Sequence, residues 1–205
     1  MMDSVLDQIQ QKLSSIAKFE DLRLDNDAFN LTFARIFAID LPEYALGKGM
    51  YGASRSNWTY HTASAMGQTA KVFGYTCKFE TAGKRDAVFE TRDDPPRPVI
   101  VAEWEWDYLD IFGPKKELEK LRDTCKACPE MDALLLVYCP MVEVPDYLYR
   151  ITQFWQENFT GSAEQPMLYI HTVVFELDGT SRTLIELVTI AVAADHVWLM
   201  SSLPL

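Results

Sequence analysis

Apolar residues recur at intervals of three and four along several stretches of the chain, and this spacing predicts amphipathic helices. In residues 3–19, for example, Val, Ile or Leu occupies every third or fourth position. Two later helices are expected to open at Gly113-Pro114 and at Pro145, because proline suits the first turn of a helix. Two further predicted helices cover residues 27–39 and 57–73.

Runs of β-branched and aromatic residues between turn signals predict strands. Short strands are expected over residues 75–81, 86–91 and 99–106. The continuous apolar run at 133–139 is typical of a central strand that is buried on both faces. Residues 57–142 are therefore expected to fold in the order helix, three strands, helix, strand.

The segments on either side of this core have a different pattern. Residues 1–47 are expected to form a helical extension, and residues 143–205 a helix and a long β-hairpin. The hairpin strands, 167–177 and 182–200, are connected by the turn signal DGTS, and a short strand is expected to end the chain. We predict one α/β (α+β) domain with a mixed sheet over residues 1–205. Because long edge strands need a partner, the C-terminal strands are expected to extend the sheet or to form a homodimer contact.

Composition and charge limit the classes of function. The chain is 48% hydrophobic and 12% aromatic, which is enough for a sizeable core. A net charge of -11 argues against passive binding to nucleic acid, although residues 48–97 hold 8 basic and 5 acidic side chains. No apolar run is long enough to span a bilayer, and the first residues lack the pattern of a secretory signal. A cytoplasmic protein without membrane contact is the expectation.

The four cysteines do not indicate a disulfide scaffold in a chain of 205 residues. Cys125 and Cys128 form a C-x-x-C motif, which is typical of half a zinc site or of a redox pair. A zinc site needs a second close pair of ligands, and the other cysteines and the three histidines are scattered. The sequence therefore favours reduced thiols at the end of a helix.

Three acidic residues are expected to lie close together on two of the predicted strands. Glu103 and Glu105 lie two positions apart, so they share one face of a strand, and Trp104 and Trp106 share the other. If the strands 86–91 and 99–106 are antiparallel neighbours, Asp86 lies next to Glu103. The alternative is an edge strand that ends in solvent with its tryptophans buried.

Three carboxylates at close range repel one another and raise each other's pKa values. A divalent cation removes this repulsion, and hard oxygen ligands suit Mg²⁺ or Mn²⁺. Such a cation polarises a phosphodiester and lowers the pKa of a bound water, which then becomes a nucleophile. The acidic cluster therefore predicts a site for metal-dependent hydrolysis.

The order of elements and the segment GYTCKFETAGKRDAVFE resemble the PD-(D/E)XK nuclease superfamily, whose fold is called restriction-endonuclease-like. The resemblance covers residues 57–142 and implies that Asp86 and Glu103 are metal ligands. It also implies that Glu80 is an accessory acid and that Gln68, on the preceding helix, belongs to the metal site.

One position departs from the family pattern. The strand motif of the family usually ends in a lysine, and here that residue is Glu105. Some restriction enzymes of the family have E-x-E at this place, so Glu105 is expected to be a third ligand or a base. Other members take the lysine from the following helix, where this chain has Lys115, Lys116 and Lys120.

Three functions follow from these observations. The first is a Mg²⁺- or Mn²⁺-dependent phosphodiesterase (nuclease) acting on DNA, with Lys84, Arg85 and Lys115 contacting phosphate. For Lys84 and Arg85 the alternative role is that of turn residues that offset nearby acids. The second function is a non-catalytic binding or assembly protein on a nuclease-like scaffold. The third is a hydrolase of a small phosphate ester, which the acidic surface would hinder less.

Overall fold

The computed structural model describes residues 5–16, 18–20, 28–41, 55–81, 85–161, 165–178 and 181–205. The helices are α1 (Val5–Leu13), α2 (Ala28–Asp40), α3 (Arg55–Val72), α4 (Glu117–Ala127) and α5 (Val144–Phe159), with a short 3-10 helix at Met141–Glu143. The strands are β1 (Lys18–Glu20), β2 (Thr76–Thr81), β3 (Arg85–Glu90), β4 (Pro98–Glu105), β5 (Asp132–Pro140), β6 (Leu168–Asp178), β7 (Ser181–Val192) and β8 (His196–Pro204).

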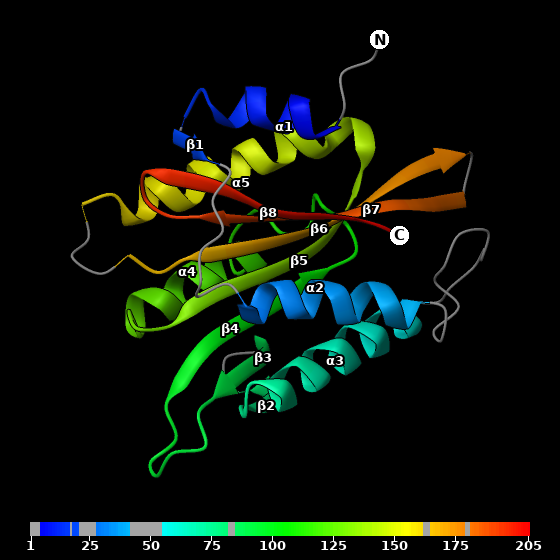
Figure 1. Ribbon diagram of the computed structural model, residues 1–205. Helices are drawn as coiled ribbons and strands as arrows, with labels where there is room; N and C mark the ends of the chain where they lie inside the picture. Colours follow the sequence, from blue (N-terminus) through cyan, green and yellow to red (C-terminus); the bar gives the residue numbers. More distant parts are fainter. Residues whose placement is uncertain are drawn as a thin grey trace.

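The eight strands form one mixed sheet in the order β1-β8-β7-β6-β5-β4-β3-β2 (Figure 1). The pairs β4–β5, β5–β6 and β1–β8 are parallel, whereas β2–β3, β3–β4, β6–β7 and β7–β8 are antiparallel. The predicted α/β class is therefore confirmed. From α3 to β5 the elements follow the predicted order helix, three strands, helix, strand.

Helices cover both faces of the sheet. On one face α2 and α3 lie side by side, and on the other face α1, α4 and α5 pack (Figure 1). Successive apolar residues of β5 pack on opposite faces of the sheet. Leu134 and Leu136 belong to the core under α2 and α3, and Leu135 and Val137 belong to the core under α1, α4 and α5. This two-sided burial is the reason why β5 is a continuous apolar run. None of the described helices is long and apolar enough to cross a membrane.

The C-terminal strands differ from the prediction in one respect. The segment 182–200, predicted as a single strand, divides into β7 and β8, which pair antiparallel around a turn after Val192. A continuous strand of that length would reach far beyond the neighbouring strands of the sheet, whereas the turn lets both halves pack on it. These strands extend the sheet beside β5, which is one of the two predicted arrangements. The homodimer contact stays a prediction.

The N-terminal segment also differs from the prediction. The first helix ends at Leu13 rather than continuing to Phe19, and residues 18–20 form β1. This strand pairs in parallel with the start of β8. A strand of three residues carries too little sequence pattern to be recognised by its periodicity.

The start of α4 lies three residues after the predicted one. Gly113 has a φ angle of 114° and Lys115 has a φ angle of 63°, and neither value is compatible with a right-handed helix. The segment Gly113-Pro114 therefore belongs to a turn, and α4 begins at Glu117. This shift places Lys115 before the helix and Glu117 in its first turn.

Candidate functional site

The centre of the candidate site is the pair of strands β3 and β4. Their register pairs Ala87 with Ala102, which places Asp86 beside Glu103 on the face covered by α4. The backbone N–H of Trp104 donates a hydrogen bond of 2.8 Å to Oδ2 of Asp86. The predicted proximity of these two carboxylates is therefore confirmed, at the carboxyl end of the parallel strands β4 and β5. Ligand sites of open α/β sheets typically lie at this end.

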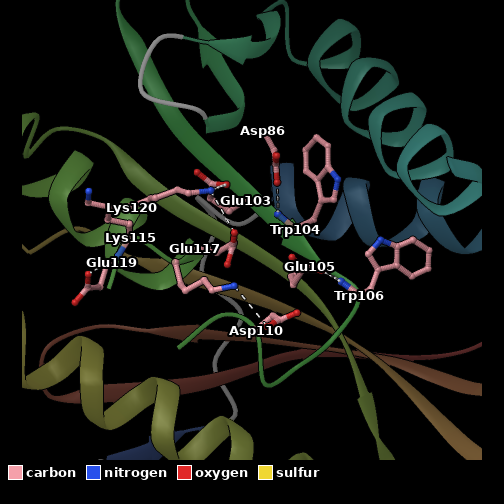
Figure 2. A network of polar contacts seen from close by, with 11 residues as sticks. Asp86, Glu103, Trp104, Glu105, Trp106, Asp110, Lys115, Glu117, Glu119 and Lys120 are labelled. Atoms are coloured by element: carbon pink, nitrogen blue, oxygen red, sulfur yellow. Dashed lines mark hydrogen bonds and ion pairs between the residues drawn. The ribbon is translucent and has the colours of Figure 1, made fainter. Parts of the chain in front are cut away.

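A lysine from α4 completes the cluster. The ammonium of Lys120 lies 3.2 Å from Oε2 of Glu103 and 3.2 Å from Oε1 of Glu117. Glu103 is fully buried, and the Lys120 side chain is 23% exposed. Figure 2 shows Lys120 reaching from α4 towards Glu103, with Glu117 on the same side.

Burial and like charge shift the pKa values of the acidic residues upwards. Burial, together with the charge of Asp86, raises the pKa of Glu103 to about 8 although Lys120 opposes the shift. Burial also raises the pKa of Asp86 against the opposing effects of the Trp104 N–H and of Lys120. For Lys120, burial lowers the pKa, but Glu103 and Glu117 outweigh it and the pKa is raised. Without a cation the protonated form of Glu103 therefore persists to a much higher pH than that of a free glutamate.

The donor atoms fit a cation that needs few protein ligands. Within the described part of the chain, Oε1 of Glu103 and Oε2 of Glu117 are buried and have no hydrogen-bond partner. Mg²⁺ typically takes one or two carboxylates and completes its shell with water and phosphate oxygens. The described residues do not contain a group of three or more His, Cys, Asp or Glu side chains arranged for a metal. The site therefore suits an ion held by two carboxylates and its substrate, rather than an ion enclosed by protein.

A cleft of about 400 Å³ opens beside this cluster. Four acidic residues line it, and each comes from a different element: Glu80 from β2, Asp86 from β3, Glu105 from β4 and Glu117 from α4. Glu80 has a φ angle of 50°, which is unusual for a residue other than glycine and is found more often at functional sites. The predicted accessory acid and the predicted third ligand therefore both lie at the cleft that Asp86 lines.

Glu105 lies on the same face of β4 as Glu103, as predicted. Its Oε1 accepts a hydrogen bond of 2.7 Å from the backbone N–H of Trp106. Trp104 and Trp106 pack on the other face, towards α2 and α3 (Figure 2). The alternation predicted for this strand is therefore confirmed.

Two of the predicted residues are directed away from the cluster. Gln68 donates a hydrogen bond of 2.5 Å to Asp40 on α2, so the expectation that it joins the metal site is not met. The reason is that its helical position faces the neighbouring helix rather than the sheet. Arg85 donates a hydrogen bond of 2.6 Å from Nε to Thr124 Oγ1, which ties β3 to α4. This contact favours the structural role of Arg85 over phosphate binding.

The other two phosphate-binding candidates have different outcomes. Lys84 lies outside the described residues. Lys115 is exposed in the turn before α4, where its backbone N–H donates a hydrogen bond of 2.9 Å to Glu119. Its side chain is thus available to solvent, and its role in phosphate binding stays a prediction.

The role of Arg85 leads to a test with a small expected effect. Thr124→Val removes the acceptor of Arg85 Nε, and we expect a loss of about 1 kcal/mol in the free energy of unfolding, as for a typical hydrogen bond. Hydrolysis is expected to change less than twofold. Urea unfolding and an activity assay measure the two quantities. A large loss of activity at unchanged stability would instead place Arg85 in the substrate site.

The sequence does not single out Glu117 as a site residue. The signal that points to it is its spacing from Lys120, because residues three apart on a helix are neighbours. The C-x-x-C motif stays outside the cluster. Cys125 and Cys128 are not in a disulfide, and burial raises the pKa of Cys125 to about 12, which disfavours thiolate chemistry.

Comparisons with protein-family models, with curated proteins and with solved structures gave no match to this chain. The assignment of function therefore depends on the geometry of the site and on the resemblance of its motif.

Proposed function

We propose that the protein is a divalent-cation-dependent phosphodiesterase that acts on DNA. The observation that carries this proposal is the cluster of Asp86, Glu103 and Lys120. It joins two adjacent carboxylates with raised pKa values to a lysine that reaches them from the following helix. Strongly perturbed ionisable groups beside a cleft are typical of catalytic sites.

The residues have separate roles in this proposal. Asp86 and Glu103 would hold Mg²⁺ or Mn²⁺, which supplies Lewis-acid polarisation of the phosphodiester and a bound water of lowered pKa. Lys120, which contacts Glu103 and Glu117, would hold these carboxylates in place and orient the attacking water. Glu105, which lines the cleft, would accept a proton from this water. Lys115, exposed in the turn before α4, would contact phosphate.

The resemblance to the PD-(D/E)XK superfamily supports the proposal. The order of elements from α3 to β5 agrees with the family core, and the acidic residues occupy the second and third strands of that core. The missing lysine of the strand motif is replaced by a lysine from the following helix, as in other members of the superfamily. Among the candidates Lys115, Lys116 and Lys120, the ion pair with Glu103 selects Lys120.

The proposal is tested by the release of nicked plasmid and of labelled oligonucleotide fragments in Mg²⁺, in Mn²⁺ and in excess chelator. We expect hydrolysis with either ion and none with chelator. The double variant Asp86→Ala/Glu103→Ala, purified in the same way, controls for a contaminating nuclease. Equal activity of the two proteins would exclude this site.

A non-catalytic binding or assembly protein on the same scaffold is the second candidate. The observations that favour it are the net charge of -11 and the glutamate at the usual position of the catalytic lysine. Calorimetry with millimolar Mn²⁺ separates the candidates. If the ion neither binds nor shifts the melting temperature, the carboxylates are structural and this second function is the correct one.

A further inference from the structure

The cleft beside the acidic cluster has a second lining, which is aromatic. Tyr60 from α3 and Phe79 from β2 line it together with Trp104 and Trp106. The side chains of Tyr60 and Phe79 are exposed, at 68% and 43%. Large aromatic groups are favoured inside proteins, so two exposed rings at one cleft are informative.

The aromatic residues of the cleft fall into two groups. Trp106 is held in the core by ring contacts to Trp58 and Tyr138, with centroids 5.2 and 5.5 Å apart. Tyr60 and Phe79 come from a helix surface and from the edge strand β2, and they keep much of their surface in water. Their ring faces are therefore accessible to a planar ligand.

The charge of the cleft decides which form of nucleic acid it suits. The described residues that line it include four acids and neither lysine nor arginine. Double-stranded DNA carries about one charge per 1.7 Å of axis, against about one per 3.4 Å for each strand, and it offers no exposed base face, so the acidic lining disfavours the duplex more than a single strand. An unpaired base, in contrast, stacks on aromatic rings without needing a cation for each contact.

The dimensions agree with one nucleotide rather than a duplex. A volume of about 400 Å³ lies at the lower end of the range of ligand sites and is far too small for a double helix. Asp86 lines the same cleft as the two exposed rings. A base in the cleft therefore brings its adjacent phosphodiester to the acidic cluster.

We infer that Tyr60 and Phe79 form a stacking site for an unpaired nucleobase and that the preferred substrate is single-stranded DNA, either free or at a frayed end. This inference rests on the proposed function, because it assigns the substrate class of the same site. It assigns binding to the rings and hydrolysis to the carboxylates, so that the two can be measured separately.

Binding is measured by fluorescence anisotropy of a labelled single-stranded oligonucleotide and of its blunt duplex, in chelator so that no hydrolysis occurs. We expect the single strand to bind more tightly. Tyr60→Ala and Phe79→Ala are each expected to weaken its binding about tenfold, as is typical of the loss of one base-stacking contact. Val72→Ala, an exposed change on the same helix as Tyr60, is the matched control and is expected to leave binding unchanged.

Hydrolysis of the same two substrates in Mg²⁺ completes the test. Faster cleavage of the single strand, with a raised KM in both aromatic variants, supports the inference. Equal binding of single strand and duplex, or wild-type binding by both variants, overturns it and leaves the proposed hydrolysis intact. Tighter binding of a lysine-rich peptide than of DNA also overturns it. If no DNA is cleaved but the single strand binds through the rings, the proposed hydrolysis fails and the stacking site stands.

Discussion

Glu103→Gln is expected to abolish hydrolysis and, at alkaline pH, to stabilise the fold. The amide keeps the size of the side chain but removes a proposed metal ligand, and we expect the rate to fall by at least about 10³-fold. A residue with a purely structural role would not combine these two effects. The combination therefore separates a functional carboxylate from a structural one.

The sign of the stability change follows from the pKa of Glu103, which rises from 4.5 to about 8 on folding. The stability linked to its proton is fully present below pH 4.5 and is lost as the pH rises through 8. Glutamine resembles the protonated form at every pH. The stability of the variant relative to the wild type should therefore rise across this window, by on the order of 5 kcal/mol at pH 9, at about 1.4 kcal/mol per pKa unit.

Urea unfolding at pH 5, 7 and 9, in chelator, measures the gain. Glu90→Gln is the matched control, because Glu90 lies on the neighbouring strand β3 in a partly exposed ion pair with Lys78. It is expected to cost no more than about 1 kcal/mol and to leave hydrolysis unchanged. A Glu103→Gln variant that is active, or that is less stable than wild type at pH 9, would contradict this role for the carboxyl.

Much of the core was predictable because its pattern is local. The alternation in β4 fixes that Glu103 and Glu105 share a face, and the short connections between β2, β3 and β4 bring Asp86 beside Glu103. The same reasoning placed β5 in the centre of the sheet, because only a strand covered on both faces is apolar at every position.

The parts that were not predictable depend on contacts between distant segments. The start of α4 is set by left-handed backbone at Gly113 and Lys115, so the helical periodicity of that segment could not locate it. The position of this start decides which lysine faces the sheet. The sequence alone could not distinguish Lys115, Lys116 and Lys120 in this respect. The direction of Gln68 was not predictable for a related reason, because its hydrogen-bond partner, Asp40 on α2, lies 28 residues earlier in the chain.

The acidic composition has a physical consequence for the site. Burial and the charge of Asp86 disfavour the ionised form of Glu103, which is fully buried in a protein of net charge -11. Lys120 opposes this effect, and it is shared as a counter-ion between Glu103 and Glu117. Replacing a buried ion pair by apolar groups of the same volume often leaves stability unchanged or raises it, so a cluster of this kind is typical of sites that are kept for function.

Lys120→Met is expected to remove hydrolysis as Glu103→Gln does, but with the opposite effect on stability. The variant leaves Glu103 and Glu117 without their shared counter-ion, and breaking a buried ion pair by removing one partner is strongly destabilising. Because Lys120 is 23% exposed, we expect about 2 kcal/mol rather than the full cost of a buried pair. The rate should fall by about 10²- to 10⁴-fold, as for other groups that assist proton transfer.

The pH dependence of this loss identifies its cause. Without Lys120 the pKa of Glu103 should rise further, so the variant should lose more stability at pH 9 than at pH 5, where Glu103 is protonated. Lys116→Met is the matched control, since Lys116 precedes the same helix and pairs with the exposed Asp110 at 3.5 Å. It is expected to leave the rate within twofold and stability within about 0.5 kcal/mol.

The double variant Glu103→Gln/Lys120→Met tests whether the two residues act as one unit. If Lys120 stabilises the fold mainly by neutralising Glu103, its removal should cost much less once Glu103 is an amide, and the two stability changes should not add. The destabilisation that remains would come from Glu117, which also loses its ion pair with Lys120. Additive changes would mean that Lys120 acts through another partner, and Glu103 would then lose its place beside the lysine in the proposed site.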